Sequence, residues 1–241
     1  MLFRSDFAIV HDVAELDAIV AEARAGGSLG LAVITEGAPA VSAALVGLAV
    51  STRAHQARYV PLAHAGLSET PNLPLADVLA RLSPALEDAA VAKAGHDLKY
   101  AAIVLGAHGV TLAGLDLDVM VASYLVDSMR ASHELDQIAG ATAGYQAMTE
   151  DQVRGKGAKA LAWSQVPPES ILVFASERAE LPVRMAPALA GELTSLGLMS
   201  VYADLERPLI PILADIETAG IRLDTAALAR QSAAMAAELA G

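Results

Sequence analysis

The residues best suited to chemistry lie together in one short segment, Gly95-His96-Asp97-Leu98-Lys99-Tyr100. This segment reads as a turn that opens an amphipathic helix over residues 97–105. His96 and Asp97 could form an acid–base pair, but adjacent residues on a helix do not face each other. A carboxylate at this position more often caps the free backbone N–H groups of the first helical turn. We therefore interpret Asp97 as a helix cap and His96 as a solvated side chain.

The other candidates for a chemical site are scattered. The remaining histidines stand at strand ends and in loops, without the spacing of a zinc site. No glycine-rich nucleotide motif follows a strand, and no Ser/His/Asp arrangement stands out. Arg154, Lys156 and Lys159 form a small basic loop with glycines, which is more typical of a solvated connector than of a phosphate cradle.

Composition restricts the class of protein. The 241 residues suggest one compact domain, or one domain with an appendage, and 54% of them are hydrophobic, enough for a sizeable core. A net charge of −12 has the wrong sign for a protein that binds phosphate backbones through bulk electrostatics. The absence of cysteine excludes disulfides and thiolate metal sites. No charge-free run reaches the ~20 apolar residues of a membrane span, so we expect no membrane partner and a cytoplasmic address.

The hydrophobic pattern predicts an α/β chain whose early antiparallel strands pack under a helical second half. We expect strands at residues 7–10, 29–35, 41–51, 57–62, 91–95 and 112–116, and helices at 13–25, 75–82, 84–90, 97–105, 118–126 and 133–139.

The last forty residues carry the signals of two further helices. Asp204 can cap the first helix and Gly220 can end it, while Asp224 can cap the second. Both helices carry an apolar stripe at helical spacing. We expect the stripes to pack partly on each other and to leave apolar surface exposed.

The segment from Gly95 to Tyr100 resembles the second motif of the 3′–5′ exonuclease domain of bacterial family A DNA polymerases (DNA polymerase I). Other segments resemble the same domain in the same order along nearly the whole chain. They are residues 43–49, 59–64, 118–125, 155–157, 163–167, 207–213 and 220–224.

This resemblance implies a ribonuclease H-like fold, with a mixed sheet and flanking helices, followed by the start of a polymerase. The exonuclease-like domain would cover residues 1–196, and residues 197–241 would be a truncated helical segment of the polymerase domain. The implied partners are the remainder of the polymerase chain and, through it, DNA. Because the chain ends inside a segment that resembles a polymerase helix, we expect a fragment of a longer protein.

The resemblance also marks the family's catalytic positions in this sequence. The paired acids of the first motif correspond to Ala32 and Ile34, and the metal-binding aspartate of the second motif corresponds to Ala101. The tyrosine and aspartate of the third motif correspond to Phe174 and Arg178. Two divalent ions need several oxygen ligands. None of the family's four carboxylates stands at its position, so we expect an inactive exonuclease-like domain with no metal and no cofactor.

Two alternatives stay open. The first is an active, Mg²⁺- or Mn²⁺-dependent 3′–5′ exonuclease that uses the displaced acids Glu36, Asp97 or Glu177. The second is a protein-interaction module that stands alone.

Two expectations concern single side chains. Lys99 and Tyr100 occupy positions at which the family touches a single-stranded 3′ end, and we expect weak nucleic-acid contact at His96, Lys99 and Tyr100. Arg178 is expected to fill the former metal cavity and to pair with Asp97 or another nearby acid, because an unpaired buried charge is costly.

Overall fold

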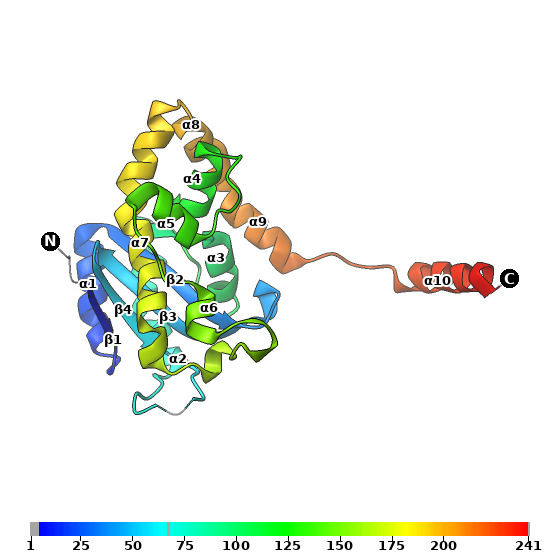
Figure 1. Cartoon of the computed structure of the whole chain (residues 1–241), viewed down its shortest axis with the longest axis horizontal. Helices are drawn as coiled ribbons and strands as arrows, with labels where there is room; N and C mark the ends of the chain where they lie inside the picture. The colour runs from blue at the N-terminus through cyan, green and yellow to red at the C-terminus, as the bar shows by residue number, and fades with distance from the viewer. Residues whose placement is uncertain (1–4, 67, 241) are drawn as a thin grey trace.

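A computed structural model describes residues 5–66 and 68–240 of the chain. Its centre is a six-stranded sheet with the order β1-β4-β3-β2-β5-β6. Figure 1 labels the first four strands of this sheet. The strands are β1 (Asp6–Ile9), β2 (Ser28–Glu36), β3 (Ala44–Arg53), β4 (Gln56–Pro61), β5 (Ala92–Gly95) and β6 (Leu115–Asp118).

The sheet is mixed, which confirms the expected α/β class. β2 and β4 both run antiparallel to β3, whereas β5 runs parallel to β2 and to β6. The expectation that all the early strands are antiparallel is wrong for β1, which lies parallel to β4 at one edge of the sheet. A parallel neighbour needs a crossover connection, and the helix after β1 together with β2 and β3 supplies that connection.

The period-two alternation of β2 divides the core into two sides. Leu29 and Leu31 join the hydrophobic core that contains α1 (Glu15–Gly26) and α2 (Leu75–Leu86). Gly30 lies on the other side, against the long helix α7 (Pro168–Ser195), where an added Cβ would lie 2.1 Å from the carbonyl oxygen of Ala179. Only glycine allows this close approach of strand and helix.

Five of the remaining helices match predicted ones with shifted ends. They are α3 (Leu98–Gly106), α4 (Val119–Val126), α5 (Leu135–Ala143), α9 (Arg207–Ala219) and α10 (Thr225–Ala240). The other short helices were not predicted. They are η1 (Ala40–Ser42), α6 (Glu150–Arg154), η2 (Gly157–Lys159), η3 (Trp163–Gln165), α8 (Met199–Val201) and η4 (Tyr202–Glu206).

Two predicted elements differ in kind. The expected helices at 75–82 and 84–90 are the single helix α2, which contains Pro84 and ends at Leu86. The buried residues of α2 continue past the proline to Ala85 and Leu86, so packing maintains the helix there. The strand expected at 112–116 begins only at Leu115, where its pairing with β5 starts.

The C-terminal helices confirm one predicted end and one predicted cap. Gly220, with φ of 67°, follows the end of α9, and the Asp224 carboxylate accepts a hydrogen bond from the Ala227 backbone N–H at 2.9 Å. The cap predicted at Asp204 is wrong, because η4 runs through that residue without a break between α8 and α9. Tyr202 anchors this stretch: its hydroxyl accepts from the Asp118 N–H at 2.8 Å.

The two C-terminal helices do not pack on each other as expected. α9 packs against α3, with Ile210 and Ala214 buried. In contrast, α10 projects away from the body beyond an extended segment (Figure 1), and none of its described residues is buried. Within the described residues, no helix is both long enough and apolar enough to span a bilayer.

Candidate functional site

Strand β2 places two of the marked positions on one side of the sheet, as its alternation predicts. Ile34 is 4% exposed and belongs to a hydrophobic cluster with Phe174, which is 2% exposed, and Ala32 packs against the same cluster. Trp163 completes the contact, with its ring centroid 4.8 Å from that of Phe174. At the positions that the resemblance assigns to the first acid pair and to the tyrosine, the structure therefore has a packed apolar cluster.

The position of the second motif lies on α3. Ala101 is 4% exposed and belongs to the core cluster on the side of α1 and α2, not to the cluster of Ile34 and Phe174. Asp97 caps α3 as predicted, because its carboxylate accepts from the Tyr100 backbone N–H at 3.1 Å. Its backbone is left-handed, with φ of 56°, a conformation that aspartate tolerates better than most residues.

The turn at the start of α3 is held in place by Asp118, a carboxylate that was not among the predicted site residues. Asp118 is 1% exposed and accepts hydrogen bonds from the backbone N–H groups of Leu98 at 2.7 Å and of Met120 at 3.0 Å. Burial raises the pKa of the Asp118 carboxyl above its ordinary value. Asp118 thus connects the starts of α3 and α4, and its oxygens are used by backbone donors.

Arg178 binds backbone and an aromatic ring rather than an acid. Its guanidinium carbon lies 3.2 Å from the centroid of the Phe174 ring, and its Nη1 donates to the carbonyl oxygens of Phe174 at 3.2 Å and of Met148 at 3.4 Å. Burial lowers the pKa of the guanidinium, yet arginine stays protonated at neutral pH.

The pairing expected between Arg178 and Asp97 is wrong. Asp97 uses its carboxylate as a helix cap, and Arg178 has no ion pair within the part of the chain that the structure describes. The acid beside Arg178 in sequence, Glu177, accepts from the Met148 backbone N–H at 2.7 Å instead. An aromatic face and carbonyl oxygens therefore take the place of the expected carboxylate.

Two buried acids of α7 are engaged elsewhere. Glu177 is 3% exposed and accepts from the Tyr145 hydroxyl at 2.6 Å and from the Met148 backbone N–H at 2.7 Å. Glu180 accepts from the His55 backbone N–H at 2.7 Å and pairs with Arg184 at 3.2 Å.

The displaced acids considered for an alternative site do not converge. Glu36 accepts from the Ser164 backbone N–H at 3.3 Å, Asp97 caps α3, and Glu177 holds Tyr145. Among residues 5–66 and 68–240, no group of three or more histidine, aspartate or glutamate side chains has an arrangement that could hold a metal ion.

The three residues expected to touch nucleic acid use their polar ends within the molecule. Lys99 Nζ pairs with Glu217 at 2.5 Å, and the Tyr100 hydroxyl bonds to Thr35 Oγ1 at 2.6 Å. His96 is half-buried, with Nε2 2.8 Å from the His133 carbonyl oxygen, which corrects the interpretation of a solvated histidine.

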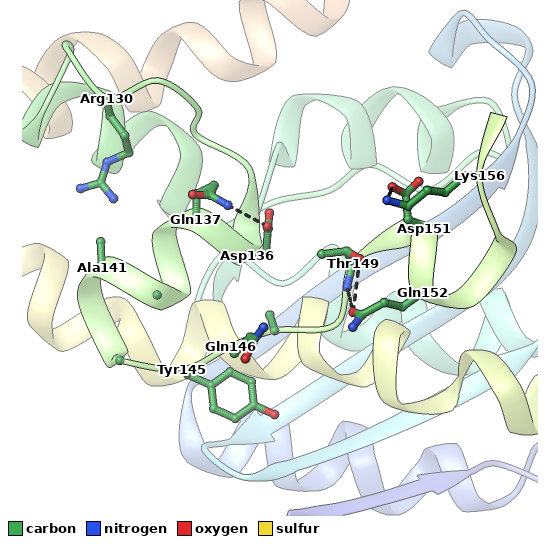
Figure 2. Close-up of a pocket in the computed structure, with 13 residues that line it drawn as sticks. Arg130, Asp136, Gln137, Ala141, Tyr145, Gln146, Thr149, Asp151, Gln152 and Lys156 are labelled. Carbon is green, nitrogen blue, oxygen red and sulfur yellow. Dashed lines mark hydrogen bonds and ion pairs between the residues drawn. The ribbon is translucent and has the colours of Figure 1, made fainter.

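A cavity lies away from the marked positions (Figure 2). It has a volume of about 890 Å³, is formed by α5, α6 and the segment between them, and its polar lining includes Tyr145, Thr149 and Gln152. Its charges are mixed, since Lys156 pairs with Asp151 at 3.3 Å. None of the five marked positions lines it.

The chain is similar in sequence to one domain of DNA polymerase I. Residues 42–173 match the family model of the DNA polymerase I ribonuclease H-like domain. DNA polymerase I of Rhizobium leguminosarum is 31% identical over 96% of this chain and 24% of its own length. DNA polymerase I of Pseudomonas aeruginosa is 33% identical over 94% of this chain and 25% of its own length. The chain therefore spans about a quarter of the length of these relatives.

Solved structures agree with this placement. The POL domain of Pol1 from M. smegmatis, in complex with a DNA primer-template and dNTP, superposes with a TM-score of 0.72 at 26% identity, over 95% of this chain and 35% of that one. Brucella melitensis NrnC shares the fold, with a TM-score of 0.61 at 19% identity over 80% of this chain and 86% of its own. These likenesses confirm the expected ribonuclease H-like fold.

Proposed function

The chain belongs to the DNA polymerase I ribonuclease H-like domain family, and we propose that it serves there as a structural module without metal-dependent 3′–5′ exonuclease activity. One observation carries the proposal: apolar packing and a guanidinium fill the positions at which the family resemblance places metal-binding acids. Ile34, Ala101 and Phe174 are buried, and Arg178 stacks on Phe174. A two-metal mechanism needs carboxylate oxygens that fix both ions, and a fixed positive charge there repels cations.

We further propose that the module supports the polymerase of a longer chain in DNA replication and repair. The domain boundary would lie at residues 196–197, and contact with DNA would be made through the polymerase. Weak nucleic-acid contact at His96, Lys99 and Tyr100 remains a prediction, as does a cytoplasmic location. Support for a longer chain comes from the relatives, whose length is about four times the part that this chain matches.

The two-sided character of α9 supports a polymerase partner. One side, with Ile210 and Ala214, is buried on the body. Ion pairs of 2.5 Å between Lys99 and Glu217 and of 3.3 Å between Arg207 and Asp116 fix the helix near its two ends. The other side carries exposed apolar residues, which are Leu205, just before the helix, Leu209, Ile212, Leu213 and Ile216. A helix with apolar residues on two sides is typical of a helix that packs between two domains. The exonuclease-like domain covers one side of α9, and we propose that the polymerase domain covers the other.

A nuclease assay tests the proposed loss of activity. The purified chain, incubated with Mn²⁺ and a single-stranded oligonucleotide labelled at its 5′ end, is expected to leave the strand intact. Without metal activation of water and leaving group, several kcal/mol of barrier lowering are lost, and each ~1.4 kcal/mol is a factor of ten in rate.

Asp97→Ala is the matched variant for this assay, because Asp97 is the displaced acid nearest in sequence to Ala101. Stepwise shortening by the unaltered chain that disappears in Asp97→Ala would show that a displaced acid rebuilds the site. The proposal of an inactive domain would then be wrong. An authentic 3′–5′ exonuclease in parallel reactions shows that the strand is a competent substrate.

A further inference from the structure

The segment between α5 and α7 has two different faces. We call residues 147–166 the strap. Its inner side chains, Met148, Val153, Trp163 and Val166, contact the cluster that contains Ile34 and Phe174. Its outer side chains, Thr149, Asp151, Gln152 and Lys156, line the cavity of about 890 Å³ instead (Figure 2). The strap therefore lies between this cavity and the marked positions on β2 and α7.

A stack of two aromatic rings between two guanidinium groups fastens the strap to α7. The guanidinium carbon of Arg154 lies 4.7 Å from the centroid of the Trp163 ring, and the Trp163 ring lies against Phe174 with 4.8 Å between centroids. Arg178 covers the Phe174 ring at 3.2 Å. Arg154 and Trp163 belong to the strap, whereas Phe174 and Arg178 belong to α7. A contact between a cation and an aromatic ring is stabilising, and more so when water is excluded from it.

Hydrogen bonds hold the strap at both ends. Near its start, the Met148 backbone N–H donates to Glu177 at 2.7 Å, and the Met148 carbonyl oxygen accepts from Arg178. Near its end, the Ser164 carbonyl oxygen accepts from the Ala65 N–H at 2.6 Å, and the Ser164 N–H donates to Glu36.

We propose that the strap is a fixed cover that closes the marked positions Ile34 and Phe174, on β2 and α7, to a strand end, and that the cationic side chain of Arg178 fastens the strap to α7. Arg178 places a positive charge at a position where the family resemblance puts a metal-binding acid, and it binds the carbonyl oxygen of Met148 in the cover itself. This inference rests on the proposed loss of the metal site. The test below measures how readily a reagent reaches position 34, not the hydrolysis of DNA. The proposed cover can therefore be refuted while the proposed loss of nuclease activity holds, and the reverse.

Thiol labelling measures this access directly, because the chain has no native cysteine. Ile34→Cys places one thiol under the strap, and Val41→Cys places one at a residue that is 41% exposed. We expect N-ethylmaleimide to modify Ile34→Cys at least about tenfold more slowly than Val41→Cys. Adding Arg178→Ala to Ile34→Cys is expected to raise its labelling rate roughly 3- to 30-fold, the range of one cation–ring contact.

Control variants distinguish local opening of the strap from unfolding of the whole domain. Lys156→Ala changes an exposed cation of the strap outside the stack and is expected to leave the labelling of Ile34→Cys unchanged. If Arg178→Ala does not fold, Arg178→Met keeps most of the side-chain volume and removes the charge. Far-UV circular dichroism and urea denaturation show whether each variant remains folded.

Two results would overturn the inference. Labelling of Ile34→Cys as fast as that of Val41→Cys would show that the strap does not cover the site. An unchanged labelling rate in folded Arg178→Ala or Arg178→Met would show that Arg178 does not fasten the strap. Acrylamide quenching of Trp163, the single tryptophan of the chain, gives an independent readout that should rise with opening.

Discussion

Replacing Ala101 with aspartate is expected to lower the free energy of unfolding by roughly 3–5 kcal/mol. Aspartate is the residue that the family resemblance places at this position, but here the side chain is 4% exposed within an apolar cluster that includes Val104 and Leu105. A carboxylate there would lose its hydration without gaining a cation. Urea denaturation of the variant and of the unaltered chain measures the difference.

Ala107→Asp is the matched control, because it adds the same charge to an exposed position just after α3. We expect this control to cost less than about 1 kcal/mol. A metal titration sharpens the comparison: if Mn²⁺ restored the stability of Ala101→Asp, the variant would be binding a cation. That result would contradict the conclusion that the described side chains around α3 cannot hold a metal ion.

Replacing Glu177 with alanine is expected to lower the free energy of unfolding by roughly 1–3 kcal/mol, because two part-buried donors lose their acceptor. These donors are the Tyr145 hydroxyl at 2.6 Å and the Met148 backbone N–H at 2.7 Å. Glu177→Gln keeps an acceptor oxygen and the side-chain shape, so it is expected to cost clearly less. Chemical denaturation of the two variants in the same buffer gives both values.

A spectroscopic readout accompanies this prediction. Burial and, secondarily, the bond to Glu177 raise the pKa of the Tyr145 hydroxyl to about 12. Removing the carboxylate of Glu177 should therefore lower the pKa of Tyr145, which ultraviolet titration against a Tyr145→Phe background detects. If Glu177→Ala were as stable as the unaltered chain and the tyrosine titration did not change, Glu177 would not anchor the strap.

The local features of the sequence predicted the parts of the structure that depend on nearest neighbours. The alternation along β2 correctly placed Ala32 and Ile34 on one side, because side-chain direction in a strand has a period of two. The Asp97 cap and the helix end at Gly220 followed from residues within one turn of each feature. These predictions required no knowledge of tertiary contacts.

Contacts between distant segments could not be predicted in this way. Arg178 has a long, flexible side chain, and its choice of a ring and the Met148 carbonyl over Asp97 depends on the path of a strap thirty residues earlier. Likewise, Asp118 serves the backbone of Leu98, which lies 20 positions away. The parallel β1 at the sheet edge depends on strand order, which hydrophobic alternation does not encode.

Mn²⁺ binding to the unaltered chain tests most directly the claim that the former metal positions are packed and closed. Calorimetric titration at neutral pH is expected to show no saturable site with a dissociation constant below about 1 mM. The described residues include no group of three or more histidine or acidic side chains that could hold a metal ion, and the carboxylates of Asp97, Asp118 and Glu177 already accept hydrogen bonds. Saturable binding of two ions at micromolar concentration, weakened by Asp97→Ala or Glu177→Gln, would contradict that account.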